Sequence, residues 1–196
     1  MKFERQIRSE KQSELFPSPA EMPAGFDYIE DVISPEEEHA LVTRLARLPF
    51  EPFKFHGYLG KRRVVSFGWR YDFNEEALRE SDPVPEFLLR LREMAAALAS
   101  VPQVELQHAL VTEYAPGAGI GWHRDKAVFK DVIAFSMCSP CRLRLRRKQG
   151  SSWQRASIGI QPRSAYILRG SARREWEHSL PPVEGLRYSI TFRNFL

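Results

Sequence analysis

A histidine and an aspartate two residues apart, His123 and Asp125, are the residues whose types and spacing first suggest chemistry. On an extended strand, or at its end, residues two apart point their side chains to the same face. An imidazole and a carboxylate can then bind one cation, and the histidine further along the chain, His178, is the candidate third ligand. Two imidazoles and one carboxylate that leave coordination positions open form the facial triad of non-haem Fe(II) oxygenases. For the pair taken alone, a surface histidine beside a salt-bridging aspartate is the alternative.

The segment 187–193 alternates polar and apolar residues without a break, so it predicts a strand with two different faces. One face is apolar and is expected in a core: Tyr188, Ile190 and Phe192. The other face carries two arginines, Arg187 and Arg193, with Ser189 and Thr191 between them. The planar fork of arginine binds a carboxylate through two parallel hydrogen bonds, so a dicarboxylate cosubstrate is a natural ligand. A solvated strand face with ordinary surface arginines is the alternative.

Taken in order, these motifs resemble the AlkB family of Fe(II)- and 2-oxoglutarate-dependent dioxygenases. The resemblance covers residues 106–195, including the sequence Tyr114-Ala115-Pro116-Gly117, and extends more loosely to the region before them. It implies a metal site and a cosubstrate site, with Fe(II), 2-oxoglutarate and O2 as cofactors. The implied iron ligands, which also make up the catalytic set, are His123, Asp125 and His178. The implied cosubstrate contacts are Arg187 to the distal carboxylate of 2-oxoglutarate, Arg193 near its metal-bound end, and Tyr114 through a hydrogen bond.

One position departs from the pattern of the family. Thr112 stands where the family usually has Asn, two residues before the tyrosine. A hydroxyl group can both donate and accept a hydrogen bond, so Thr112 stays a candidate cosubstrate contact. The strength of cosubstrate binding stays open.

The resemblance implies oxidative demethylation of N-alkylated bases in nucleic acid, as DNA repair or RNA demethylation, with release of formaldehyde and succinate. The target base is expected in a single strand or flipped out of a duplex. Two alternatives stay open: the same chemistry on a methylated protein side chain, and a catalytically silent nucleic-acid-binding module. The choice among DNA, RNA and protein, and the preferred lesion, also stay open.

The chemistry needs a scaffold, and the expected fold class is α+β: a double-stranded β-helix, or jelly roll, with supporting N-terminal helices and a substrate lid. We expect a loosely ordered arm over residues 1–24 and a single dioxygenase domain over residues 25–196, with its jelly-roll core from about residue 104. Helices are expected at 35–48 and 85–100, each with one apolar side. Strands are expected at 26–29, 106–114, 132–137, 141–147, 155–160, 164–168 and 187–193.

Between the two expected helices, the segment 50–75 combines aromatic, basic and glycine residues and is the expected lid. Cations can hold phosphates while aromatic rings stack on an unpaired base. The candidate substrate contacts are Arg62, Arg63, Trp69 and Tyr71. Packing of the aromatic residues against the domain is the alternative.

The strand expected at 141–147 has a basic face, because its arginines alternate with leucines. The members of that face are Arg142, Arg144 and Arg146. It is either a second contact for phosphates or a solvated strand face.

The composition of the chain sets the remaining expectations. The 29 Lys and Arg against 25 Asp and Glu give a net charge of +4, which permits attraction to a polyanion without requiring it. There is no apolar stretch of membrane-spanning length and no signal-peptide core, so we expect a monomeric cytoplasmic protein without a membrane partner. The Cys138–Cys141 pair is expected to flank a turn at Pro140, with a redox or zinc role as the alternative.

Overall fold

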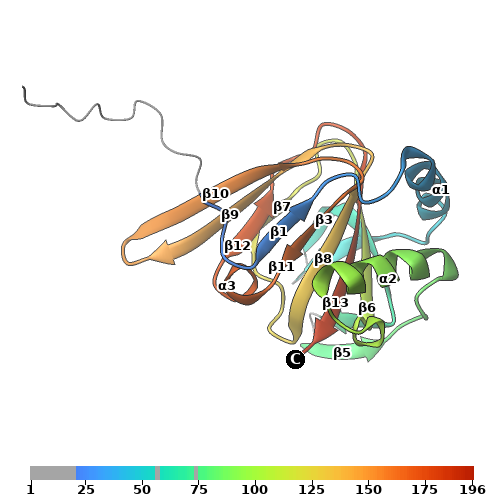
Figure 1. Ribbon diagram of the computed structural model, residues 1–196, viewed down its shortest axis with the longest axis horizontal. Coiled ribbons are helices and arrows are strands. Elements are labelled where there is room, and N and C mark those ends of the chain that lie inside the picture. Colours follow the sequence, from blue (N-terminus) through green and yellow to red (C-terminus); the bar gives the residue numbers. More distant parts are fainter. Residues whose placement is uncertain (1–20, 56–57, 73–74) are drawn as a thin grey trace, which may run out of the picture.

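The computed structural model describes residues 21–55, 58–72 and 75–196 (Figure 1). The arm expected over residues 1–24 therefore lies almost wholly outside the described residues. Two antiparallel sheets pack face to face and form the jelly roll that the sequence predicts (Figure 1). In the described part of the chain, no helix is long and apolar enough to span a membrane.

The larger sheet has seven strands and contains the final strand near its centre. Its strands, in order across the sheet, are β1 (Phe26–Ile29), β11 (Ser164–Leu168), β8 (Phe129–Met137), β13 (Arg187–Phe195), β6 (His108–Tyr114), β3 (Tyr58–Phe67) and β2 (Glu51–Phe55). The smaller sheet has four strands, in the order β10 (Ser152–Ile160), β9 (Cys141–Gln149), β12 (Glu177–Leu180) and β7 (Ile120–His123). A separate hairpin pairs β4 (Trp69–Asp72) with β5 (Ala77–Glu80).

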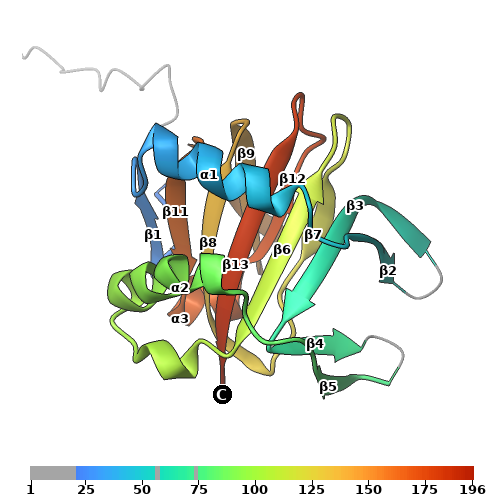
Figure 2. The same ribbon diagram turned by 90° about the vertical axis from the view of Figure 1, so that its right-hand side faces the viewer.

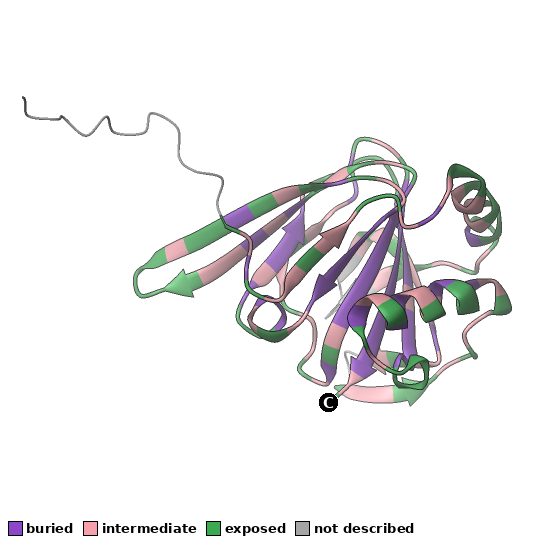
Figure 3. Cartoon of the chain, viewed as in Figure 1, coloured by how far each residue is buried: buried purple, intermediate pink, exposed green. Residues whose placement is uncertain are grey.

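Two helices cover the outer face of the larger sheet (Figure 2). They are α1 (Pro35–Leu45) and α2 (Glu86–Ala99), and their apolar sides pack on that face as expected. A second apolar cluster fills part of the space between the two sheets. The short elements η1 (Gln103–Glu105) and α3 (Gly170–Arg174) complete the fold. The central strands of the larger sheet, β11, β8, β13 and β6, are almost continuously buried, because helices cover one side and the smaller sheet the other (Figure 3).

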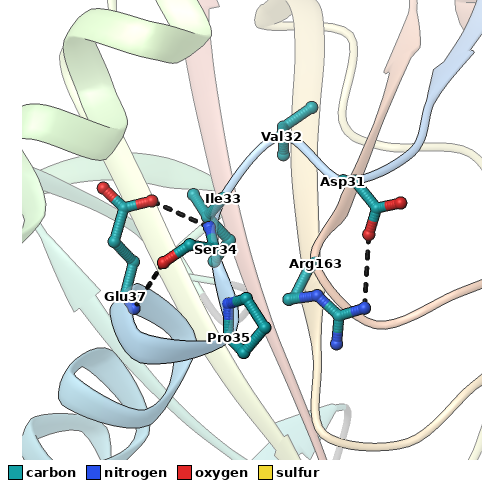
Figure 4. A pocket seen from close by; sticks show the side chains of 7 residues that line it. All are labelled: Asp31, Val32, Ile33, Ser34, Pro35, Glu37 and Arg163. Carbon is teal, nitrogen blue, oxygen red and sulfur yellow. Dashed lines mark hydrogen bonds and ion pairs between the residues drawn. The ribbon is translucent and has the colours of Figure 1, made fainter.

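Helix α1 begins where the sequence predicts and ends three residues earlier. Ser34 accepts a hydrogen bond from the backbone N–H of Glu37, and the Glu37 carboxylate accepts one from the N–H of Ser34 (Figure 4). At the other end, the N–H groups of Arg47 and Leu48 donate to carbonyls three residues back, at 3.1 and 3.0 Å. These bonds tighten the chain into a turn ahead of Pro49, so the α-helix stops at Leu45.

The expected strands all form. The strands not predicted are the ten-residue β3 and the short strands β2, β4, β5, β7 and β12. β1 and β11 have the predicted bounds, and the other predicted strands are longer or shifted by a few residues at their ends. The two strands that carry the histidines, β7 and β12, were not predicted. Each has only four residues, Ile-Gly-Trp-His and Glu-His-Ser-Leu, and contains a glycine or a run of polar residues that gives a weaker strand signal than the Phe-Asp-Tyr-Ile of β1.

Candidate active site

A cavity of about 1390 Å³ opens between the two sheets and beside the β2–β3 and β4–β5 hairpins. Its lining combines residues of β6, β7, β12 and β13 with residues of the expected lid. The sequence-predicted residues among its lining are Arg62, Tyr71, Thr112, Tyr114, His123, Asp125, His178 and Arg193. A much smaller hollow, of about 340 Å³, lies at the start of α1, where Asp31 and Arg163 pair with each other at 3.2 Å (Figure 4).

The three residues predicted to bind metal lie together in the larger cavity. Antiparallel pairing of β7 with β12 places His123 directly opposite His178, and their ring centroids are 4.2 Å apart. His178 Nε2 is 4.0 Å from Asp125 Oδ2. His123 Nδ1 lies 2.9 Å from the carbonyl oxygen of Gly121. Since a carbonyl can only accept, Nδ1 of the neutral ring carries the proton and Nε2 keeps its lone pair for a ligand.

The protonation states suit a cation. Burial lowers the pKa of His178 to about 3, and burial also lowers the pKa of His123. Both imidazoles are therefore neutral at physiological pH. Burial alone would raise the pKa of Asp125, but the neighbouring groups, Arg193 first and then His178, His123 and Arg173, together outweigh it and keep that pKa well below its ordinary value. The arrangement is thus two neutral imidazoles and one ionised carboxylate.

The fit of these residues to a metal rests on an unused oxygen atom. Asp125 Oδ1 accepts a hydrogen bond from Arg193 Nη2 at 2.8 Å, whereas Asp125 Oδ2 is buried and has no hydrogen-bond partner. A buried carboxylate oxygen without a partner is costly, and a cation between it and the two imidazoles would remove that cost. Within the described residues, no three His, Cys, Asp or Glu side chains already stand in the arrangement of a formed metal site. The residues present fit a metal ion through their donor atoms and charge.

A second unused group lies on the same face of the larger sheet. Arg187 is fully buried, and its Nε donates to Ser136 Oγ at 3.1 Å. Its Nη1 and Nη2 have no hydrogen-bond partner. Burial on its own would lower the pKa of Arg187, but Cys141, Tyr114 and Tyr166 more than offset it, so the group is charged. A buried guanidinium that is held at Nε and unoccupied at both Nη atoms can bind a carboxylate through both of them.

Strand register explains why these groups share one face. β13 pairs with β6 so that Arg187 lies opposite Tyr114, Ser189 opposite Thr112, and Arg193 opposite His108. Directly paired residues of antiparallel strands point to the same side, so all six side chains face the cavity side. The Arg187 guanidinium lies 5.0 Å from the ring centroid of Tyr114.

The structure separates the four predicted substrate contacts into two pairs. Arg62 and Tyr71 line the cavity, and Lys126 Nζ lies 5.0 Å over the Tyr71 ring. Arg63 points to the opposite side of the sheet, because it follows Arg62 in the strand, and its Nη2 pairs with Glu113 Oε1 at 2.7 Å. Trp69 is not among the cavity-lining residues, and its ring packs edge-on against Phe195 at 6.0 Å.

Four residues of the site were not identified from the sequence, three that line the cavity and Ser136, which lies behind it on Arg187. Buried His108 contacts Arg193, with 3.3 Å between its Nδ1 and Arg193 Nη1, and Ser136 orients Arg187. Tyr166 and Trp122 also line the cavity. Trp122 could have been identified from the sequence, because it directly precedes His123. The other three become visible only through strand register.

Comparison with known proteins defines the class of this enzyme. The 2OG-Fe(II) oxygenase superfamily matches residues 25–193, so the chain belongs to that superfamily and is a 2-oxoglutarate-dependent dioxygenase. The fold agrees with a solved structure, "The structure of OsALKBH1", with a TM-score of 0.68 and 13% sequence identity over 89% of this chain and 98% of that one.

Within the superfamily, the chain is AlkB-like. It is 26% identical over 147 residues to the "Alkylated DNA repair protein ALKBH8 homolog" of Arabidopsis thaliana, covering 63% of this chain and 42% of that protein. It is also 26% identical over 187 residues to "Uncharacterized protein L905" of Acanthamoeba polyphaga mimivirus, covering 88% of this chain and 85% of the viral one. The chain thus spans less than half of the Arabidopsis relative and most of the viral one.

Proposed function

We propose that this dioxygenase removes N-linked methyl groups from bases of nucleic acid, with His123, Asp125 and His178 as the ligands of Fe(II). The observation that carries the proposal is a set of buried atoms without partners, one in the cavity and two on Arg187, which is not itself a lining residue but lies behind the lining residue Tyr114. Asp125 Oδ2 and both Nη atoms of Arg187 are buried charged atoms without partners. Native proteins leave few such atoms unpaired, so these atoms support the binding of a cation at Asp125 and of a carboxylate at Arg187. Fe(II) and 2-oxoglutarate supply these two groups.

The chemistry that the bound cofactors would supply is C–H hydroxylation coupled to cosubstrate oxidation. One O2 is consumed per turnover: one oxygen atom ends in succinate as 2-oxoglutarate loses CO2, and the other enters the methyl C–H bond. The hydroxymethyl amine then breaks its C–N bond, so that formaldehyde leaves and the nitrogen keeps a proton. This balance predicts equal amounts of succinate and formaldehyde.

The chain's own residues bind and orient. Arg187 binds the distal carboxylate of the cosubstrate through its two Nη atoms, and Ser136 fixes the direction of that fork. Arg193 holds Asp125 ionised and fixes its Oδ1, which leaves Oδ2 for the metal. Tyr114 and Thr112 line the same side and offer hydroxyl groups to the cosubstrate.

The substrate end of the cavity supports a nucleic-acid base. A volume of about 1390 Å³ exceeds the range of about 300–1000 Å³ typical of small-molecule sites, so a flipped-out base has room beside the cosubstrate. Arg62 and the Lys126–Tyr71 pair supply cations and an aromatic ring at this end. The name of the Arabidopsis relative, an alkylated DNA repair protein, supports the same class of substrate.

The proposal also covers domain organisation. Residues 25–196 form a single catalytic domain, and the segment 50–75 acts as its lid. The β2–β3 hairpin supplies Arg62 to the cavity and strand β4 supplies Tyr71, which supports a lid role for this segment.

The test compares three substrates in parallel with added Fe(II) and 2-oxoglutarate. Formaldehyde and succinate are measured from N-methylated single-stranded DNA, from N-methylated RNA and from a methyl-lysine peptide. Release from either nucleic acid, lost in His123→Ala, is the expected result. Release from the peptide alone would overturn the substrate assignment. Tight binding of nucleic acid without formaldehyde or succinate would instead favour the silent binding module.

A further inference from the structure

The outer face of the smaller sheet carries a row of cations that the proposed mechanism does not use. Along β9, the leucines Leu143 and Leu145 are fully buried between the sheets. The side chains between and beyond them point outward, because strand residues alternate. Pairing with β10 places Trp153 opposite Lys148, Arg155 opposite Arg146 and Ser157 opposite Arg144. We call the outward residues of β7, β9 and β10 the basic-aromatic face; they are Trp122, Arg142, Arg144, Arg146, Lys148, Trp153 and Arg155.

Cations and aromatic rings alternate along this face. The guanidinium carbon of Arg144 lies 5.1 Å from the ring centroid of Trp122, and that of Arg146 lies 4.4 Å from it. Arg146 also lies 4.3 Å from the ring centroid of Trp153. These contacts join β7 to the hairpin in one row. They also hold the rings and guanidinium groups in fixed positions before any ligand arrives.

Most of the positive charge on the face has no acidic partner. Arg146 pairs with Glu177 at 2.6 Å. Among the described residues, no ion pair neutralises Arg142, Arg144, Lys148 or Arg155. Arg142 and Arg144 donate to the hydroxyls of Ser157 and Ser179, at 3.2 and 3.1 Å. A neutral hydroxyl orients a guanidinium and leaves its charge available to an anion.

The face begins at the cavity and leads away from it. Trp122 is both a member of the face and part of the cavity lining, next to His123. The β9–β10 hairpin extends beyond the rest of the molecule, and its outer residues are exposed or half-buried (Figures 1 and 3). Arg142 and Lys148 are six residues apart on β9, which corresponds to about 20 Å of strand.

We propose that the basic-aromatic face binds the nucleotides that flank the target base, so that a single strand runs from the cavity along the β9–β10 hairpin. Its guanidinium and ammonium groups contact phosphates, and Trp122 and Trp153 offer flat surfaces for neighbouring bases. A length of about 20 Å matches the rise of about six stacked nucleotides. The inference rests on the proposed function for its substrate, and the face itself is tested separately from catalysis.

The experiment measures binding of a fluorescent single-stranded oligonucleotide of about twelve nucleotides, a length that covers the cavity and the face. The test variant combines Arg142→Gln, Lys148→Gln and Arg155→Gln, which are exposed and outside the cavity. The matched control removes three exposed arginines on or just after the helices on the other side of the molecule: Arg44→Gln in α1, Arg47→Gln two residues beyond its end and Arg90→Gln in α2. Both variants lose three positive charges, so a difference in their affinity for the oligonucleotide shows that the location of the charges matters.

The salt dependence of binding gives the expected magnitude. Each phosphate contact on a single strand contributes about 0.7 to the slope of log K against log salt, so the test variant should lower that slope by about 2. Its affinity at low salt should fall by about tenfold or more, while the control keeps the wild-type slope. Equal slopes for the test variant and the control would overturn the proposal. The proposal would also be wrong if the test variant lost as much affinity for a polyglutamate peptide of matched charge as for the oligonucleotide, because the face would then bind acidic polymers in general.

Turnover separates this proposal from the proposed function. With a methylated trinucleotide, which occupies only the cavity, the test variant should match the wild-type rate of formaldehyde release. With the longer oligonucleotide, its KM should rise by about the same factor as its binding constant. If the wild-type protein released no formaldehyde from either substrate, the result would count against demethylation. The salt dependence of oligonucleotide binding would still test whether the basic-aromatic face binds nucleic acid. A normal KM of the test variant for the long substrate would count against the face alone.

Discussion

The two faces of strand β13, at the centre of the larger sheet, are both buried and are chemically opposite. On the helix side, β13 contributes Tyr188, Ile190 and Phe192, which are at most 2% exposed and pack in an apolar cluster. On the cavity side, the same strand contributes Arg187 and Arg193, which are 0% and 7% exposed. Alternation along a single strand therefore supplies both the core and the site.

The two faces differ in whether their buried polar atoms have hydrogen-bond partners. On the helix side, the one polar atom of the β13 residues in the apolar cluster, the Tyr188 hydroxyl, donates to Glu113 Oε2 at 3.1 Å. On the cavity side, Asp125 Oδ2 and both Nη atoms of Arg187 have no partner. Each buried unsatisfied polar atom costs about 1–3 kcal/mol, and more when it is charged. On β13 and its neighbours, the candidate site therefore differs from the apolar cluster in holding buried charged groups that leave atoms without a partner.

The largest effect is expected from removal of a cavity-side imidazole. His178→Ala should lower turnover by more than about a hundredfold, because even the partners of metal ligands cost about 10- to 100-fold when mutated. The measurement is the rate of succinate formation at saturating 2-oxoglutarate. His39→Ala is the matched control, since it removes an exposed imidazole from α1. Equal rates of succinate formation in His178→Ala and His39→Ala would contradict the assignment of the site to the cavity side.

The next effect is on the helix side and on stability. Phe192 is fully buried and packs against Phe135 with a ring-centroid distance of 6.2 Å. Phe192→Ala should lower the free energy of unfolding by about 3–5 kcal/mol. Urea unfolding measures the change, with Leu196→Ala, at an 83% exposed position, as a control expected within about 0.5 kcal/mol of the wild type. If Phe192→Ala lowered the free energy of unfolding by less than about 0.5 kcal/mol, as an ordinary surface substitution does, the assignment of this face to the core would be wrong.

A smaller and more specific effect is expected from Arg187→Lys. Lysine keeps the charge and loses the planar fork, so it would remove one of the two charge-assisted hydrogen bonds that we propose between Arg187 and the cosubstrate. The KM for 2-oxoglutarate should rise about 10- to 100-fold, with a smaller change in kcat. Arg163→Lys, in an ion pair with Asp31 at the protein surface, should leave this KM unchanged. An unchanged KM in Arg187→Lys would show that the carboxylate binds elsewhere.

The smallest effect concerns the helix that covers the core face. Ser34→Ala removes the side-chain half of the capping box of α1 and should cost about 1 kcal/mol of unfolding free energy. Turnover per folded molecule should stay at the wild-type value, because α1 does not contribute to the cavity lining. Thermal unfolding and the succinate assay, run on the same preparation, measure both quantities. A change in turnover without a change in stability would contradict the separation of the two faces.

The sequence predicted those parts of the molecule that are set by local patterns. Alternation along 187–193 predicted the two faces of β13, and Ser34, Pro35 and Glu37 predicted the start of α1. The pairing of β7 with β12 depends on partners more than 50 residues apart, so spacing could name His123 and His178 but could not place them opposite each other.

The contacts around the cavity were the hardest to predict. Arg62 and Arg63 are adjacent and identical in type, and only the register of β3 against β6 decides that one lines the cavity and the other pairs with Glu113. Ser136 and His108 have no local signal, because their roles come from the neighbours that Arg187 and Arg193 meet across the sheet.

Metal binding tests the central claim most directly. Calorimetric titration with Mn(II) under anaerobic conditions, in the presence of 2-oxoglutarate, measures the affinity and the number of ions per chain without any turnover. The account predicts a single bound ion in the wild-type protein and in His39→Ala, and loss of that binding in His123→Ala and in His178→Ala. Wild-type affinity for Mn(II) in the last two variants would contradict it.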